Sequence, residues 1–459
     1  MQLAHIIRTR ARMDAEPGTI AHLASALRSR TLTSRSITDG CLRVIAERNP
    51  ALNAFITVLG DTARDQADRA DSEMNAGQYR GPLHGVPISL KDLIDVRDQA
   101  TSAASRVRQG HIAAVDATVV TRLREAGAVI VGKTNLHEFA FGTTNEDSAF
   151  GPARHPLDPS RSPGGSSGGS AVSVLADMAY ASIGTDTGGS VRIPSAVCGL
   201  VGLKPSLGEI PIDGVVPLSG TMDHVGPMCR SVEDAGILFD VLRGETPALG
   251  RHVPDVHGLR LGVLRGYFMA IIDPEVAERF DRACDRLQAA GVDLYDVDVA
   301  HADDIAPIYL HIVLSEAAAY HAPTLESHAD DYTPNVRLRL EMGRYVLAED
   351  YVRGLRGRDV LIREVDEALT GCDGLLLPTL PIPAPTIGSG MVRIGGSEES
   401  VRSVTLRLTQ LFNLTGHPAI SIPCGSTREG WPVGAQLVGH RHRTTALLGT
   451  ASAIEPYLS

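Results

Sequence analysis

Several features of membrane, secreted and metal-binding proteins are missing from this sequence. No run of about 18 apolar residues occurs, so we expect no transmembrane helix. The first residues lack a lysine-flanked apolar core with a small-residue cleavage site, which argues against a secretory signal and favours the cytoplasm. The six cysteines are far apart and form no C-x-x-C pair, so we expect buried thiols and neither a metal site nor a disulfide framework.

Positive charge is the scarcer sign, and lysine is scarcer still. The chain has 43 basic and 54 acidic residues, and its net charge of −11 argues against a general binder of nucleic acid or of anionic membranes. Only three basic residues are lysines, at Lys91, Lys133 and Lys204. An arginine keeps its proton, whereas a buried lysine can lose it and act as a base. Each lysine is therefore a candidate for chemistry or for tight packing.

The 459 residues are enough to bury a large core, and the order of predicted elements favours one domain. Predicted strands and helices alternate from Phe55 to Val438 with no clear linker and no internal repeat, which indicates an α/β fold with helices on both sides of a sheet. We predict one domain over residues 1–459, made of an N-terminal helical arm over 1–50 and an α/β core over 51–459.

Local patterns also predict individual elements within this core. Residues 301–369 are mainly helical, with a break at Tyr332 to Pro334, and Val404 to Asn413 is predicted as one helix. The stretches over 209–228 and 378–390 are predicted to be irregular loops.

Two glycine and serine clusters, Gly164 to Ser170 and Gly188 to Ser190, stand out along the chain. An apolar segment long enough for one helix and one strand separates them, which a flexible linker would not contain. We interpret the clusters as two tight loops, each of which carries serine. Glycine allows a close approach of the backbone to another group, and successive N–H groups in such loops can bind a negative oxygen.

These loops and Lys91 supply groups that amide cleavage needs. A predicted buried strand, Val86 to Leu90, ends directly before Lys91, at the edge where a sheet meets its loops. A neutral lysine can act as the base, and Ser166 can pass a proton to it from Ser190 because a hydroxyl both donates and accepts. An ion pair with Asp92 or Asp95 is the alternative for Lys91, while Lys133 and Lys204 are interpreted as packing or pairing residues.

Longer motifs surround these residues in the sequence. They are GVPISLKD at 85–92, VGKTNLHEFAFG at 131–142, GGSSGGS at 164–170, GTDTGGSVRIPS at 184–195, and NLTGHPAISIPCG with PVGAQLVG within 413–439. Over most of the chain these motifs closely resemble the amidase signature family of Ser–cis-Ser–Lys hydrolases. The resemblance implies a mixed central β-sheet flanked by α-helices on both faces, and chemistry that needs no cofactor.

The resemblance also implies a role for each matching residue. Ser190 would be the nucleophile, Ser166 the serine on a cis peptide bond, and Lys91 the base. The implied oxyanion hole consists of Thr187, Gly188, Gly189 and the Ser190 amide. Supporting positions are implied for Ser167, for Thr185 as a hydrogen-bond partner of Ser166, and for Asp186 and Arg192. For Arg192, binding of a substrate carboxylate is a less favoured alternative to a scaffold role.

Two other classes of protein fit part of the sequence. Residues 164–168 also match G-x-S-x-G, the nucleophile elbow of α/β-hydrolases, but the prolines just before them exclude the buried strand that an elbow requires. The resemblance further covers the amidase subunit of tRNA-dependent amidotransferases, which works only in a complex. We favour a chain that acts alone, as a monomer or homodimer, on a small molecule.

Three loops, over 142–163, 208–228 and 378–402, are expected to surround the substrate. They show no basic cluster for an acidic substrate, so we predict neutral, hydrophobic or aryl amides, with Gly142, Thr143 and Thr144 as substrate contacts. Apolar side chains that would suit such a substrate are Leu380, Ile382, Ile387, Met391 and Leu411. The alternative is a urethanase, which would hydrolyse carbamates to amine, alcohol and carbon dioxide by the same residues.

Overall fold

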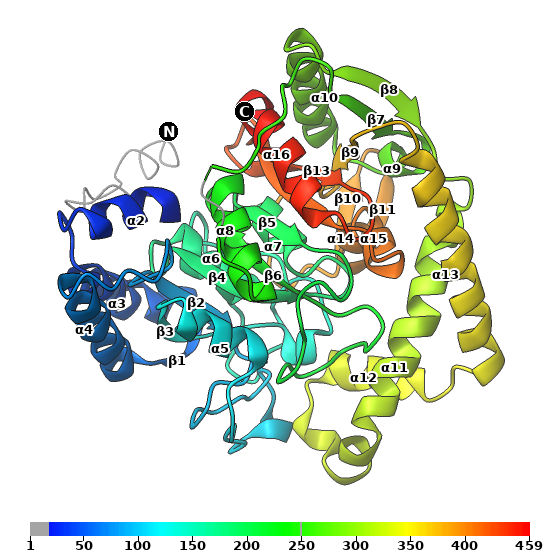
Figure 1. Cartoon of the computed structure of the whole chain (residues 1–459). Helices are drawn as coiled ribbons and strands as arrows, with labels where there is room; N and C mark the ends of the chain where they lie inside the picture. Colours follow the sequence, from blue (N-terminus) through cyan, green and yellow to red (C-terminus); the bar gives the residue numbers. More distant parts are fainter. Residues whose placement is uncertain (1–17, 248–249) are drawn as a thin grey trace.

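The computed structural model describes residues 18–247 and 250–459 of the chain (Figure 1). The sequence interpretation of the first residues, and part of the predicted arm over 1–50, fall in residues 1–17 and lie outside the described part. The described remainder of that arm is helical, because α2 (Ile20–Arg28) and α3 (Ser34–Leu52) occupy it. The Thr33 hydroxyl caps α3 by accepting a hydrogen bond from the Ser36 N–H at 3.1 Å.

Eleven strands of the described chain form one mixed sheet, in the spatial order β1-β3-β2-β4-β6-β5-β12-β13-β9-β7-β8. The strand bounds are β1 (Phe55–Val58), β2 (Pro87–Lys91), β3 (Val129–Thr134), β4 (Ala181–Asp186), β5 (Val201–Lys204), β6 (His224–Cys229), β7 (Arg260–Leu264), β8 (Asp293–Val297), β9 (Gly374–Pro378), β12 (Ala419–Ser426) and β13 (Pro432–Val438). A separate hairpin pairs β10 (Met391–Ile394) with β11 (Ser397–Ser400).

Helices cover both faces of this sheet, as the resemblance implied. Figure 1 shows α8 and α16 in front of the sheet and α6 and α7 behind it, with α11 and α13 side by side at one edge. The remaining helix bounds are α4 (Gly60–Asn75), α5 (Thr118–Glu125), α6 (Gly168–Leu175), α7 (Arg192–Val197), α8 (Val232–Arg243), α9 (Gly266–Ala270), α10 (Pro274–Ala289), α11 (Ile305–Ser327), α12 (Pro334–Gly343), α13 (Ala348–Ala368), α14 (Val401–Arg407), α15 (Gln410–Leu414) and α16 (Thr444–Leu458).

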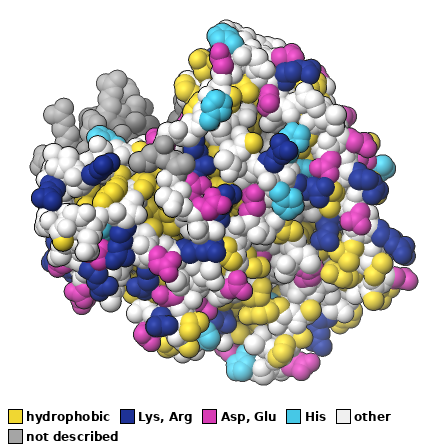
Figure 2. All heavy atoms as spheres, viewed as in Figure 1, with side chains coloured by type: hydrophobic (Ala, Val, Ile, Leu, Met, Phe, Trp, Pro, Cys, Tyr) yellow, Lys and Arg dark blue, Asp and Glu magenta, His cyan; other side chains and the backbone are white. Residues whose placement is uncertain are grey.

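The buried strands of this sheet read as apolar runs because helices cover them on both sides. Ile88, Leu90, Ile130 and Ile183 have no exposed surface and belong to the largest hydrophobic cluster. All six cysteines are buried and unpaired, which confirms the expectation of buried thiols. No helix within the described residues is long and apolar enough to cross a bilayer. Basic and acidic side chains are interspersed over the face that Figure 2 shows.

Parallel pairing at the centre of the sheet brings the ends of two strands together. β2 lies between β3 and β4 and is parallel to both, with Leu90 opposite Ile183. Carboxyl ends of neighbouring parallel strands lie at the same edge of a sheet. Lys91 at the end of β2 therefore lies beside Thr185 and Asp186 at the end of β4.

Three local predictions were wrong. The helix predicted over Val404 to Asn413 is two helices, α14 and α15, because the chain breaks at Thr409, whose side chain binds a distant loop. β6 lies inside the stretch that we expected to be irregular, although His224, Gly226 and Pro227 disfavour a strand. Its Val225 and Met228 are buried between β4 and β5, so tertiary packing outweighs local propensity. The β10–β11 hairpin also begins just after the predicted proline-rich loop.

Candidate active site

Lys91 lies at the centre of the candidate site, where β2 ends. Its side chain has no exposed surface, and its Nζ lies 2.7 Å from Ser166 Oγ and 2.8 Å from Thr185 Oγ1. Burial lowers the pKa of Lys91 to about 7, although the charges of Asp186 and Asp223 oppose this shift. At neutral pH a large share of this amine is therefore unprotonated and can accept a proton.

The nearer alternative partner of Lys91 is engaged elsewhere. Asp92 forms a buried ion pair with Lys133 at 2.9 Å, and Lys133 also donates to the Ala100 carbonyl and the Thr101 hydroxyl, each at 2.7 Å. The predicted packing role of Lys133 is therefore confirmed, and an ion pair of Lys91 with Asp92 is wrong. β2 and β3 are adjacent, which is why the lysine of one strand reaches the aspartate that follows the other.

The first serine loop, over 164–167, leads directly into α6. The peptide bond between Gly165 and Ser166 is cis. Gly165 allows a close approach to the neighbouring loop, because a Cβ there would lie 2.8 Å from the Thr144 amide nitrogen. The Ser167 N–H donates to the Ser190 carbonyl at 3.3 Å, so the two serine loops are in direct contact.

The second loop follows β4 and presents four free N–H groups. None of the backbone N–H groups from Thr187 to Ser190 donates a hydrogen bond to a described residue. Side chains hold the loop from two directions. The Thr187 hydroxyl donates to Asp223 Oδ1 at 2.5 Å, and the Thr409 hydroxyl donates to the Gly188 carbonyl at 2.6 Å. A fixed loop with free donors is the arrangement that stabilises a developing negative oxygen.

Ser190 is the most accessible of the three candidate catalytic residues, with 6% of its surface exposed, while Lys91 and Ser166 have none. Its hydroxyl makes no hydrogen bond within the described part of the chain, to Ser166 or to any other residue. Its backbone nevertheless lies against the loop of Ser166 through the Ser167 N–H. The three residues thus come together in the fold, with the Ser166–Ser190 side-chain contact still to be made.

Asp186 and Arg192 form a buried ion pair beneath the second loop. All five N–H groups of Arg192 have acceptors, and the distances are 3.0 and 2.9 Å to Asp186, 2.6 Å to Gln436, 2.7 Å to Asn413 and 3.0 Å to the Thr409 carbonyl. Burial alone would raise the pKa of Asp186, but the charge of Arg192 outweighs burial and holds this pKa far below its usual range. With every donor used, Arg192 has no donor left for a substrate carboxylate, so its place is in the scaffold.

The expected substrate loop lies against both serine loops. The Thr143 hydroxyl accepts a hydrogen bond from Thr405 of α14 at 2.9 Å, and the Thr144 carbonyl accepts one from Ser162 at 2.7 Å. Gly142 lies under the His137 ring, since a Cβ there would meet that ring at 2.1 Å. These contacts fix the loop beside Ser166 and make it a candidate to touch the substrate.

Other sequence-based assignments differ from the structure. The hydroxyl of Thr185 contacts Lys91, whereas we expected it to bond Ser166, because both side chains point inward from adjacent parallel strands. The five apolar residues do not form one surface. Leu380 and Leu411 lie in the main core, Ile382 lies in a small cluster with Ile394 and Val404, and Met391 is 46% exposed.

Sequence reasoning also missed residues that hold the site. Asp223 accepts from Thr187 and from the N–H groups of Leu218 and Ser219, and burial raises the pKa of its carboxyl to about 6. The Tyr309 hydroxyl lies so close to Gly188 that a Cβ there would approach it to 2.5 Å. Asp223 follows the irregular-looking stretch and Tyr309 lies inside a long helix, so neither had a local signal.

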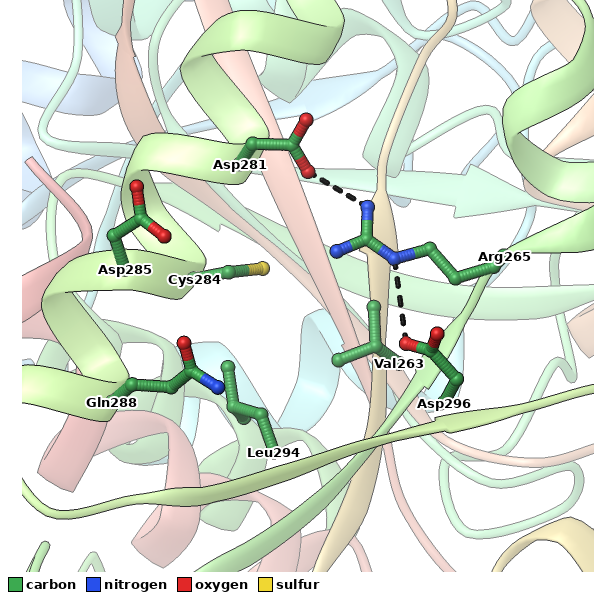
Figure 3. A pocket seen from close by; sticks show the side chains of 8 residues that line it. All are labelled: Val263, Arg265, Asp281, Cys284, Asp285, Gln288, Leu294 and Asp296. Atoms are coloured by element: carbon green, nitrogen blue, oxygen red, sulfur yellow. Dashed lines mark hydrogen bonds and ion pairs between the residues drawn. The ribbon is translucent and has the colours of Figure 1, made fainter.

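Two surface cavities lie away from these residues. One, of about 390 Å³, lies between α10 and the strands β7 and β8 (Figure 3). Its Arg265 already contacts Asp281 at 2.7 Å and Asp296 at 3.5 Å. The other, of about 500 Å³, lies between residues 107–111 and α11. Neither cavity is lined by a candidate site residue, so the candidate chemistry lies at the serine loops.

Comparisons with known proteins agree with this site. Residues 36–448 match the Amidase family. An amidase from Pseudomonas putida is 41% identical over 426 residues, which cover 90% of each chain. A glutamyl-tRNA(Gln) amidotransferase subunit from Koribacter versatilis is 33% identical and is covered completely, as 97% of this chain is. A crystal structure of an amidase superposes with a TM-score of 0.91 at 35% identity, over 96% of this chain and all of that one. This chain therefore belongs to the Amidase family of hydrolases.

Proposed function

We propose that this enzyme cleaves the C–N bond of amides through an acyl-enzyme on Ser190, with Lys91 and Ser166 as the proton relay. The observation that carries the proposal is the buried Lys91 amine, 2.7 Å from Ser166, beside a loop with four N–H groups that no described residue accepts. An amine with a pKa of about 7 is near the optimum for a general base at neutral pH.

In the acylation step, neutral Lys91 takes the Ser166 proton while Ser166 takes the proton of Ser190. The Ser190 oxygen attacks the amide carbon, and the N–H groups of the second loop bind the resulting oxyanion. When the C–N bond breaks, the proton on Lys91 returns through Ser166 to the leaving nitrogen. The products of this step are a free amine and an ester of Ser190.

In the second step, water replaces the amine. Water loses a proton through Ser166 to Lys91 and attacks the ester carbon, and the returning proton restores the Ser190 hydroxyl as the acid leaves. The contact between Ser166 and Ser190 must form for both steps. Such contacts are often long in a free enzyme and tighten in the substrate complex.

For the substrate class, two members of the range predicted from the sequence remain proposals. Hydrophobic or aryl amides would acylate Ser190 as described, and carbamates would give a carbamoyl-enzyme that water converts to amine and carbon dioxide. Initial rates of the purified chain on an anilide and on the matching phenyl carbamate distinguish these two substrates.

A second candidate function is that of the amidase component in a tRNA-dependent amidotransferase. The full-length match to the Koribacter versatilis protein supports it. That role requires companion proteins, whereas we propose that this chain acts alone in the cytoplasm, as a monomer or homodimer. Turnover of a simple amide by the purified chain supports independent action, and activity that appears only with copurifying proteins supports the complex.

The chemistry itself is tested with Ser190→Ala and with Ser167→Ala as a matched control. Ser190→Ala should abolish amide turnover, because the attacking oxygen is lost. Ser167 donates through its hydroxyl to the Thr185 carbonyl at 3.2 Å, so its variant tests loop support without removing the nucleophile. Full turnover by Ser190→Ala would refute the proposed mechanism.

A further inference from the structure

α14 (Val401–Arg407) joins the two loops of the candidate site. Its Thr405 donates to the Thr143 hydroxyl at 2.9 Å. Its Leu406 packs on the oxyanion loop, since a Cβ on Gly188 would lie 2.9 Å from Leu406 Cδ2. Arg402 precedes these residues by three and four positions, which places it on the same face of the helix. That face is turned toward the site.

Arg402 has no counter-charge within the described residues. No carboxylate there forms an ion pair with its guanidinium within 4.0 Å, and its Nε is buried without a hydrogen-bond partner. Its close contact is with the Phe141 ring, whose centroid lies 5.8 Å from the guanidinium carbon. An unpaired buried cation is costly, and proteins normally give it an anion. Burial accordingly lowers the pKa of Arg402.

A second arginine increases this excess of positive charge. Arg339 of α12 lies 5.9 Å from the same Phe141 ring and donates to the Phe141 carbonyl at 2.6 Å. Burial and the charge of Arg402 lower the pKa of Arg339 to about 10, while Asp147 opposes the shift. Asp147 is itself engaged with His137 at 3.1 Å and with Asn335.

The charged and titratable groups around Arg402 are thus Arg339, His137 and Tyr309. Burial lowers the pKa of His137, which favours its neutral form, and burial raises the pKa of Tyr309 above its usual range. Neither group supplies a negative charge at neutral pH. The site therefore has two cations beside Phe141, one residue before Gly142, and no anion in direct contact among the described residues to balance Arg402.

We propose that Arg402, with Arg339 beside it, binds a carboxylate of the substrate, so that the preferred amide carries a carboxylate on its acyl part. A guanidinium presents paired donors that match the two oxygens of a carboxylate. This inference rests on the proposed amide hydrolysis, and it replaces the neutral substrate that the three loops suggested in the sequence. Arg339 lies outside those loops, so the sequence did not show that the two arginines meet.

Two pairs of isosteric primary amides test the inference. Succinamate is compared with 4-methylpentanamide, and glutaramate with 5-methylhexanamide, so that each pair differs by a carboxylate against an isopropyl group. The readout is the ratio of kcat/KM values within a pair, measured by ammonia release. Hydrogen bonds to a charged group predict a ratio of about 10 to 100 in favour of the carboxylate in at least one pair.

Variants of α14 assign this preference to Arg402. Arg402→Gln should lower the ratio about 10- to 100-fold, mainly through KM, and Arg402→Lys should restore part of it. Arg407→Gln is the matched control on the same helix, because Arg407 donates to the Tyr267 carbonyl at 2.8 Å, outside the site. This control should keep the wild-type ratio.

The outcomes separate this inference from the proposed function. Equal or faster cleavage of the neutral member in both pairs, or an unchanged ratio in Arg402→Gln, overturns the carboxylate inference and leaves amide hydrolysis intact. Where neither pair turns over, protection of Ser190 from a fluorophosphonate decides: protection by glutaramate but not by 5-methylhexanamide, lost in Arg402→Gln, supports the inference, and any other pattern overturns it. Absence of both turnover and labelling of Ser190 overturns the proposed function itself.

Discussion

Replacement of Lys91 by methionine tests whether this amine is neutral in the folded enzyme. Methionine has nearly the same length as lysine and no charge, so the change removes the base and keeps most of the packing. We expect turnover to fall by about 10²- to 10⁴-fold, the usual contribution of a general base. The same variant should also change how stability depends on pH, which reports the pKa directly.

The magnitude follows from the two pKa values of Lys91. Its pKa is about 7 when folded and 10.5 for an exposed lysine, so between these values the unfolded chain binds more protons than the folded chain. Stability of the wild type therefore rises with pH in this window, by at most about 1.4 kcal/mol per pH unit. From pH 7 to pH 9 the rise attributable to Lys91 is about 2 kcal/mol.

The assay is urea unfolding of the wild type and of Lys91→Met at pH 7, 8 and 9. The difference in unfolding free energy should shift by about 2 kcal/mol toward the wild type over this range. The lost contacts of Ser166 and Thr185 add a constant that does not change with pH in this way. Lys133→Met is the matched control, and it should destabilise the fold by about 3–5 kcal/mol because Asp92 loses its buried partner. A pH-independent difference for Lys91→Met would show that the amine keeps an ordinary pKa.

Three further predictions follow from the same contacts. The value of kcat/KM should fall about tenfold per pH unit below pH 7 and level off above it, as Lys91 loses its proton, and a flat profile from pH 5 to 9 would contradict this. Arg192→Lys should lower the unfolding free energy by about 3–5 kcal/mol, because three donors replace five in a buried network, and a loss below about 1 kcal/mol in urea unfolding would be inconsistent with it. Gly188→Ala should cost about 10²-fold in kcat, since its Cβ meets Tyr309, and Gly188→Ala with Tyr309→Phe should recover part of this loss; no recovery would argue against the steric cause.

The sequence was sufficient for features that are local in the chain. The glycine and serine clusters indicated two tight loops before any strand was located, and the apolar run before Lys91 placed that residue at a sheet edge. The scarcity of lysine added weight to Lys91 and also to Lys133, which pairs with Asp92. These inferences depended only on residue type and on spacing within a few turns of chain.

Contacts between distant segments could not be predicted in this way. Thr409 is 221 residues from the Gly188 carbonyl that it binds, and the local pattern around it predicts an uninterrupted helix. Arg339 and Arg402 lie on α12 and α14, and only the folded chain brings both to Phe141. Asp223 likewise depends on β6, a strand whose residues carry little strand propensity.

The most direct test of the central claim is peptide mapping by mass spectrometry after treatment of the enzyme with a fluorophosphonate. The reagent reacts with a serine oxygen that a neighbouring base has activated, so the proposed relay predicts one added group, on Ser190. Ser190→Ala should acquire no adduct, and Lys91→Met should react far more slowly than the wild type. An adduct on another residue, or one that persists in Ser190→Ala, would contradict the proposed activation of Ser190 by Lys91 through Ser166.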